Sequence, residues 1–168
     1  MLIENGCDPD SEESLGMTSS SWAAGEGHSG LAIDLLDLSA TLDVRDVRWH
    51  TPLMWAAKTG HRDVVELLLR RGAENEFRDR NGQTPLSLAA RHGQRAVVEC
   101  LLEAGANVES SDHDGQTALS WAANQYYLDI VKLLLDNEVV FDVTTLQVAP
   151  SPVHTLLGDD DRLKTGCP

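Results

Sequence analysis

Three threonines, Thr51, Thr84 and Thr117, lie 33 residues apart, and each opens a similar short segment. The segments read TPLMWAA, TPLSLAA and TALSWAA. A fixed period of this size is typical of a solenoid, in which each repeat buries its apolar face only against its neighbours. Together with the helix signals of each unit, the spacing predicts an all-α stack of short units. Such a stack presents a long surface rather than one deep active-site cavity, which favours binding over catalysis.

Each repeat carries the signals of two short helices. In the unit that starts at Asp79, the letters DRNG predict a turn, and Thr84 followed by proline predicts a helix start. Gly93 ends this first helix, the run VVECLL predicts a second one, and Gly105 ends that. Isolated helices shorter than about 12 residues are marginal in water, so stacking must supply the core.

The period divides the chain into segments that match the repeat pattern to different degrees. They are a partial back-half repeat at 1–12, a degenerate repeat at 13–45, repeats at 46–78, 79–111 and 112–144, a half repeat or C-terminal cap at 145–158, and a disordered tail at 159–168. Ser19 and Ser20 replace the Pro-Leu of the stronger repeats, so the degenerate repeat lacks a core leucine. In the last full repeat Tyr126 replaces a helix-ending glycine, and Asn137 is the candidate left-handed end of the second helix.

Charge and cysteine content exclude several classes of function. The net charge of −14 opposes general binding to nucleic acid or to an anionic membrane surface. No apolar run approaches the ~18 residues of a membrane span. Three cysteines without a CxxC pair argue against a disulfide framework or a zinc site. We expect an intracellular protein, cytoplasmic or nuclear, in a reducing compartment.

No residue pattern indicates an enzyme or a cofactor. The sequence contains no HExxH and no glycine-rich phosphate loop, and we expect neither a metal nor a small-molecule substrate. His28 and His61 follow helix-ending glycines without a partner set for metal binding, so we interpret them as structural. Cys100 lies between core valines and leucines, so we interpret it as a small buried residue.

The units resemble ankyrin repeats. The period, the Thr-Pro-Leu start, the Ala-Ala pair, the Gly-His pair, the Val-Val-x-x-Leu-Leu helix and the Gly-Ala ending all match that family. The resemblance implies stacked helix-turn-helix units with projecting β-turn loops, and a non-enzymatic scaffold or adaptor that binds another protein, as a monomer. A histidine that the family places after Thr-Pro-Leu is replaced here by Met54, Ser87 and Ser120.

The resemblance also implies where a partner would bind, at the turn tips and at the exposed ends of the first helices. The matching residues are Arg45, Arg48, His50, Lys58, Arg78, Arg80, Asn81, Gln83, Arg91, His92, His113, Asp114, Gln116 and Asn124. Of these, Arg78, Arg80 and Arg91 are candidates for a patch that binds acidic motifs or phosphate, because arginine binds both groups in a bidentate manner. The alternative is a solvated face that nearby acidic residues neutralise.

Trp22, Trp55 and Trp121 follow the period, and Leu88 occupies the remaining position. A ladder of rings could line a peptide groove. We favour the simpler interpretation that these rings are interior or half-buried packing, since large apolar residues at helical spacing usually belong to a core.

A second hypothesis concerns the whole chain. Residues 2–8 match residues 101–107, three periods later, so the repeats begin midway through a unit. This pattern is expected if the chain is a detached or truncated segment of a larger multi-domain protein. The array would then be a sensor or a substrate-recognition arm.

Overall fold

The structure is a computed structural model of the chain that describes residues 17–37 and 42–146. The predictions for residues 1–12, for the half repeat beyond residue 146 and for the tail at 159–168 lie outside the described residues.

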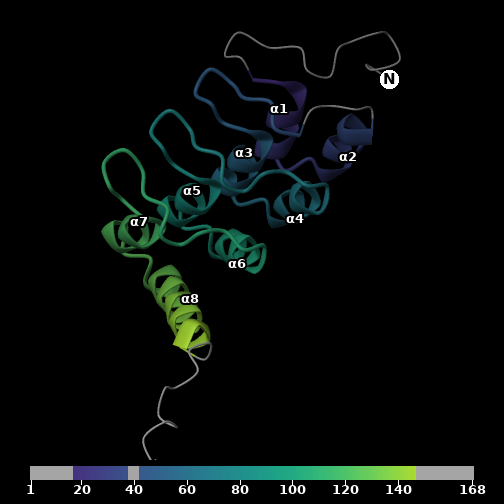
Figure 1. Cartoon of the computed structure of the whole chain (residues 1–168). Coiled ribbons are helices and arrows are strands. Elements are labelled where there is room, and N and C mark those ends of the chain that lie inside the picture. The colour runs from purple at the N-terminus through teal and green to yellow at the C-terminus, as the bar shows by residue number, and fades with distance from the viewer. Residues whose placement is uncertain (1–16, 38–41, 147–168) are drawn as a thin grey trace, which may run out of the picture.

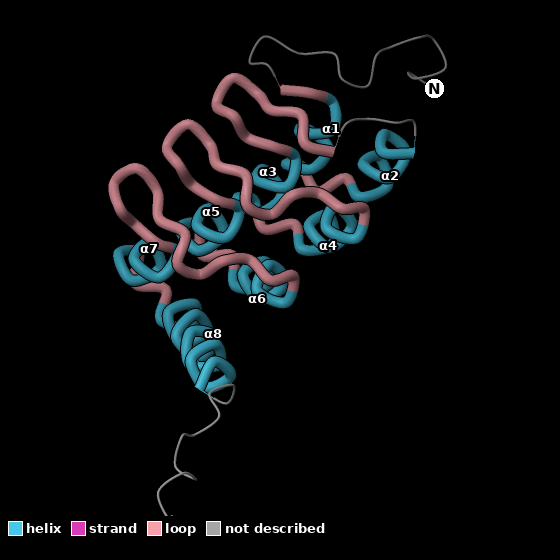
Figure 2. Tube along the Cα trace, in the orientation of Figure 1, coloured by secondary structure: helices cyan, strands magenta, loops and turns pink. Residues whose placement is uncertain are grey.

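Helices are arranged as stacked pairs. The described elements are α1 (Ser19–Gly25), α2 (Ser29–Asp37), α3 (Pro52–Thr59), α4 (Arg62–Arg70), α5 (Pro85–Arg91), α6 (Arg95–Glu103), α7 (Ala118–Asn124) and α8 (Leu128–Leu146). The first helices α1, α3, α5 and α7 pack in one row, and the second helices α2, α4, α6 and α8 in another (Figure 1). Long loops project along one edge (Figure 2), and the described residues contain no strand. The all-α solenoid predicted from the period and from the helix signals of each repeat is confirmed.

A threonine begins each first helix, as predicted. The hydroxyl groups of Thr18, Thr51, Thr84 and Thr117 each accept a hydrogen bond from the backbone N–H three residues later. This bond satisfies one of the N–H groups that have no partner within a helix. At Thr84 and Thr117 the serine three residues on returns a bond to the threonine backbone, which completes a capping box. The methionine in the Thr51 repeat has no group that could return it.

The core lies between the two rows. Ala56, Ala57, Ala89 and Ala90 are fully buried where the first helices stack, because only small side chains allow such close approach. Valines and leucines of α4 and α6 close the other side. Cys100 is part of this core, as predicted, and burial raises the pKa of its thiol.

The first described repeat has a weaker core. Ser20 and Ser21 are buried in α1 where α3 has Leu53 and Met54. Their hydroxyl groups bond to the Thr18 side chain at 3.0 and 3.1 Å, which satisfies them but buries little apolar surface.

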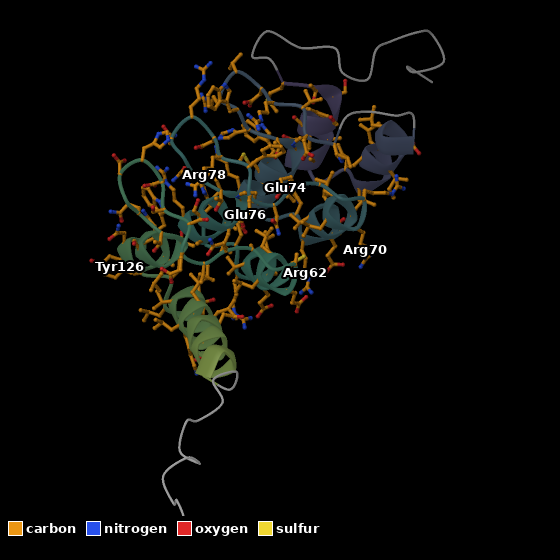
Figure 3. All side chains as sticks on the ribbon, in the orientation of Figure 1. Arg62, Arg70, Glu74, Glu76, Arg78 and Tyr126 are labelled. Atoms are coloured by element: carbon orange, nitrogen blue, oxygen red, sulfur yellow. The ribbon has the colours of Figure 1, made fainter. Side chains whose placement is uncertain are left out.

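Two non-glycine residues adopt the left-handed backbone conformation. Tyr126 has a φ of 61° where earlier repeats have glycines such as Gly60 and Gly93, and Trp49 has a φ of 65° where later turns have Gly82. A side chain in this conformation costs roughly 1–2 kcal/mol. The Tyr126 side chain is 85% exposed (Figure 3), so packing contributes little to offset that cost.

The prediction for Asn137 was wrong. The backbone does not turn there, and α8 continues to Leu146. Asn137 Nδ2 instead donates to the carbonyl of Leu133 at 2.8 Å within the helix. The next position is Glu138, whereas Gly72 and Gly105 end the equivalent helices with positive φ, so nothing local favours a left-handed end.

We predict that Tyr126→Gly raises the free energy of unfolding by about 0.5–1 kcal/mol, because glycine relieves the left-handed strain at an exposed position. Urea denaturation measures the change. Gly60→Ala is the opposing control, since Gly60 has a φ of 89° and an added side chain there introduces the same left-handed strain and should destabilise the fold. A Tyr126→Gly protein less stable than wild type would contradict the strain argument.

Hydrogen exchange should also be uneven along the stack. We expect the slowest amide exchange in residues 46–111 and the fastest among the helices in residues 18–37, where buried serines replace apolar side chains. Exchange read out by mass spectrometry checks this order. Slowest exchange in residues 18–37 would refute it.

A basic cleft between two turns

A buried aspartate anchors each described turn. Asp46, Asp79 and Asp112 are buried, and the Oδ1 atom of each accepts the backbone N–H groups two and four residues later at 2.8–3.0 Å. The local Asp-to-backbone pattern folds each loop back on itself, because the carboxylate satisfies N–H groups that the turn leaves without partners. The tip residues between these bonds project outward.

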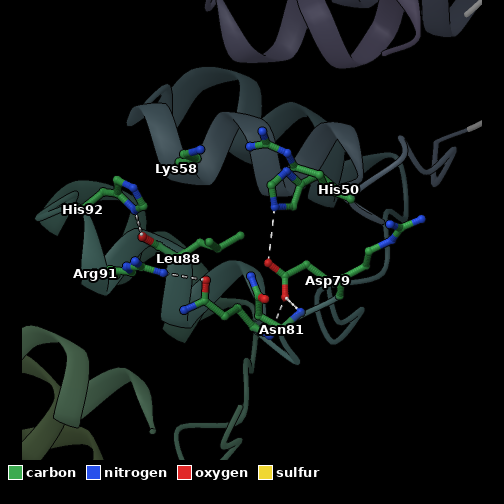
Figure 4. A pocket seen from close by; sticks show the side chains of 10 residues that line it. His50, Lys58, Asp79, Asn81, Leu88, Arg91 and His92 are labelled. Atoms are coloured by element: carbon green, nitrogen blue, oxygen red, sulfur yellow. Dashed lines mark hydrogen bonds and ion pairs between the residues drawn. The ribbon is translucent and has the colours of Figure 1, made fainter. Parts of the chain in front are cut away.

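The second carboxylate oxygen, Oδ2, has a tryptophan partner in the two flanking turns and a different partner in the middle turn. Trp55 Nε1 donates to Asp46 Oδ2 at 3.1 Å, and Trp121 Nε1 donates to Asp112 Oδ2 at 2.9 Å. Leu88 takes the tryptophan position in the middle repeat and cannot donate. There, Asp79 Oδ2 lies 3.3 Å from His50 Nε2 of the preceding turn (Figure 4). The two adjacent loops are thereby linked across the repeat boundary.

His50 and Gln83 do not belong to the exposed tips, in contrast to the sequence prediction. They are only 6% and 2% exposed. Each stands four residues after its aspartate, where the hydrogen bond to the carboxylate pulls the backbone into the stack. His50 then bonds Asp79, and Gln83 Oε1 accepts from Arg91 Nη1 at 3.2 Å. Both side chains therefore hold other residues in place and are not exposed to a partner.

A cleft of about 400 Å³ opens between these turns and the ends of α3 and α5. It is lined by Arg48, His50, Lys58, Asp79, Arg80, Asn81, Gln83, Leu88, Arg91 and His92. Eight of the ten were predicted as partner-binding residues, and the structure brings them together. The other two, Asp79 and Leu88, had a sequence signal in the period itself: aspartate recurs in every turn, and leucine interrupts the tryptophans.

Leu88 accounts for the open volume of this cleft. In the flanking repeats the indoles of Trp55 and Trp121 reach the turn aspartate, as their hydrogen bonds show. Leucine is shorter and ends below that level. In Figure 4 its side chain lies between Arg91 and His92 on one side and His50 and Asp79 on the other.

The cleft is cationic although the chain is strongly acidic. Arg48, Lys58, Arg80 and Arg91 line it against one carboxylate, Asp79. Within residues 17–37 and 42–146, none of the four cations forms an ion pair. The Arg91 guanidinium lies 4.3 Å from the ring centroid of Trp121, and the Lys58 ammonium lies 4.9 Å from that of Trp55. The charges of Arg91 and Lys58 are thereby held in place without being neutralised.

Arginines on the second helices α4 and α6, unlike the cations of the cleft, form ion pairs. Arg62 and Arg70 of α4 both bond Glu66, at 2.8 and 2.9 Å, and Arg95 of α6 bonds Glu99 at 2.6 Å. Figure 3 shows Arg62 and Arg70 on the side of the molecule away from the projecting loops. The uncompensated positive charge is therefore concentrated at the turns.

Two ionisable groups in the cleft have shifted pKa values. Burial lowers the pKa of His92, and the charges of Lys58 and Arg91 act in the same direction, although its bond to the Leu88 carbonyl opposes them. His92 is therefore neutral at pH 7. Burial raises the pKa of Asp79, but hydrogen bonds from His50 and from the N–H groups of Gln83 and Asn81 outweigh it. The net effect is a lowered pKa and an ionised Asp79.

The predicted patch of Arg78, Arg80 and Arg91 is not formed as one unit. Arg78 Nη1 donates to the carbonyls of Gly82 and Ser111, so its guanidinium braces two neighbouring turns outside the cleft lining. Arg45 stacks on the ring of Phe77, with 4.3 Å to the centroid, and also lies outside it. Arg80 and Arg91 are joined instead by Arg48 and Lys58.

The predicted residues of the next turn do not reach the cleft. His113 and Asp114 are exposed at the tip. Asn124 Nδ2 donates to Gln116 Oε1 at 3.3 Å on the neighbouring stretch of that repeat. They extend the same row of tips by one position, but they line no part of the cleft.

The tryptophans do not form a stacked ladder. Trp55 and Trp121 are half-buried and hydrogen-bonded, in agreement with the packing interpretation, whereas Trp22 is 45% exposed and lies against the His28 ring. His61 Nε2 lies 3.1 Å from the Gly25 carbonyl, which ties one repeat to the preceding one. Among the described residues, no group of histidine, cysteine, aspartate or glutamate side chains could hold a metal ion.

Comparison with known families agrees with this geometry. The family model described as ankyrin repeats (three copies) matches residues 1–79 and 68–145. The chain belongs to the ankyrin repeat family. A search of curated proteins found no match. None of the helices in the described part is both long enough and apolar enough to cross a membrane.

The lowered pKa of Asp79 predicts how its contribution to the stability of the fold changes with pH. Asp79 stabilises the fold above its unfolded-state pKa of about 3.9, and this contribution is lost as the pH falls through the lower folded value. Asp79→Asn should therefore cost about 1–3 kcal/mol near pH 5.5 and clearly less near pH 3. Urea denaturation at both pH values tests this. Asp114→Asn, at an exposed tip, is the control and should change neither value. A cost for Asp79→Asn that does not shrink with acid would rule out the assigned role.

Proposed function

We propose that this chain is a non-enzymatic protein-interaction module that binds a partner protein through its turn tips and the adjoining ends of the first helices. Ankyrin repeats are generally protein–protein interaction modules, and the family is generally non-enzymatic. The observation that carries the proposal is the cleft, where Arg48, Lys58, Arg80 and Arg91 gather without carboxylate partners among the described residues.

The turn tips are arranged in register, which supports recognition by a rigid surface. The backbone N–H of Arg80 donates to the Arg48 carbonyl at 3.1 Å, and that of His113 donates to the Asn81 carbonyl at 2.9 Å. These bonds run from tip to tip between successive repeats. A surface that is ordered before binding loses less conformational entropy when a partner docks.

Charge defines the kind of partner that fits. Cations that lack ion pairs attract a negatively charged surface and raise the association rate. The net charge of −14 disfavours nucleic acid, whose extended negative charge would face the whole acidic chain. We therefore propose that an intracellular protein with an acidic surface segment binds the chain, which acts as a monomer.

Reversal of two charges at the tips tests the proposal. Arg48→Glu with Arg80→Glu should lower the affinity for a captured and purified partner at least about tenfold, with a greater effect at low salt. Neither guanidinium makes a hydrogen bond or ion pair to a described residue, so the fold should persist.

The control is Arg70→Glu with Lys132→Glu, which changes the net charge equally at exposed positions on α4 and α8. Arg70→Glu also removes the exposed ion pair with Glu66, which contributes little to stability. The affinity of this control should stay close to wild type, and circular dichroism should show all three proteins folded. A partner that binds the tip variant as tightly as wild type would remove the basis of the proposed function.

A further inference from the structure

We propose that the cleft beside Leu88 is a receptor for an acidic side chain, so that the partner presents a peptide segment with a carboxylate at this point. This inference rests on the proposed function and adds the chemistry of the ligand. It follows from the size of the cleft, from the occupied oxygens of Asp79 and from the cations that surround them.

The size of the cleft fits a short segment. Ligand sites commonly enclose about 300–1,000 Å³, and this cleft of about 400 Å³ is near the lower limit. It can take one side chain with its flanking backbone. It lies where Leu88 interrupts the tryptophans, whereas Trp55 and Trp121 extend to the turn aspartates in the neighbouring repeats.

Asp79 does not compete for the cations. Its Oδ1 accepts the N–H groups of Asn81 and Gln83 at 2.8 Å, and its Oδ2 faces His50. Its side chain is only 2% exposed, so it contacts neither solvent nor an incoming ligand to any extent. The cleft therefore presents nitrogen donors around its rim and a carboxylate that already has its partners.

Each of the four cations can contribute differently. Arg91 is fixed between the Trp121 ring and Gln83 Oε1, which gives the cleft one ordered guanidinium. Arg48 and Arg80 project from adjacent tips and can close on a ligand from the other side. A guanidinium binds a carboxylate through two parallel hydrogen bonds, whereas the ammonium of Lys58 acts as a point charge.

The aliphatic stems of the arginines refine the ligand. Leu88 is only 3% exposed, so these stems supply the apolar surface, and they can pack against methylene groups, which glutamate has in greater number than aspartate. A ligand that carries a single carboxylate is also repelled little by the acidic residues elsewhere in the chain, because charges beyond a Debye length of about 10 Å are screened at 0.1 M salt. We expect glutamate to be preferred.

Leu88→Trp is the decisive variant, because it fills the cleft without changing any charge. The flanking repeats accommodate tryptophan at the equivalent position, so the variant should fold. Ala96→Trp is the matched control and places the same side chain at an exposed position on α6. The full chain is panned against a displayed library of random short peptides. An enriched peptide is then synthesised with glutamate, glutamine or phosphoserine at the acidic position, and affinity is measured by fluorescence anisotropy.

We expect enrichment of acidic peptides, and a loss of affinity of at least about tenfold on replacing glutamate by its neutral isostere glutamine. Leu88→Trp should cause a similar loss, and Ala96→Trp should not. Enrichment of neutral or basic peptides, equal binding of the glutamate and glutamine forms, or binding of the phosphoserine form alone would each overturn the proposal.

The variants separate this inference from the proposed function. Partner binding that is lost in Arg48→Glu with Arg80→Glu but retained in Leu88→Trp would overturn the cleft as a receptor and leave the interaction function standing. Loss in both variants, with both controls active, supports the two together. Retention in both would overturn both.

Discussion

The buried aspartate of each turn is the interaction on which the rest of the surface depends. Its carboxylate binds two backbone N–H groups and fixes the loop, and its second oxygen fixes a neighbouring side chain. Burial of a carboxylate is costly unless it is fully hydrogen-bonded, and here the turn supplies those bonds. The same bonds determine that Arg48 and Arg80 project while His50 and Gln83 are held inside.

Stacking places the two sides of the cleft together. Arg48 and Lys58 come from one repeat, whereas Arg80, Leu88 and Arg91 come from the next. Fully buried alanine pairs set the spacing of the first helices, and hydrogen bonds between successive tips set the register of the loops. The candidate site is therefore a property of two adjacent repeats and would not exist in either one alone.

The sequence predicted the parts of the fold that depend on local signals. Threonine caps, glycine ends and the buried Cys100 follow from the periodic pattern, because each requires only its own neighbours in the chain. Contacts between repeats were harder to predict. The bond from His50 to Asp79 joins residues 29 apart, and no local pattern indicated that His50 would be buried. Nor could spacing alone show that a leucine among tryptophans opens a cleft, since that depends on the height of the flanking side chains.

The central claim is that unpaired cations between two turns form the binding surface, and an NMR titration tests it most directly. The isotope-labelled full chain is titrated with a glutamate-containing peptide enriched by panning. The account predicts the largest shifts at the side chains of Arg48, Lys58, Arg80 and Arg91, together with a rise in the pKa of His92 as negative charge approaches it. Shifts concentrated on α4 and α6, with these four side chains unchanged, would contradict the account.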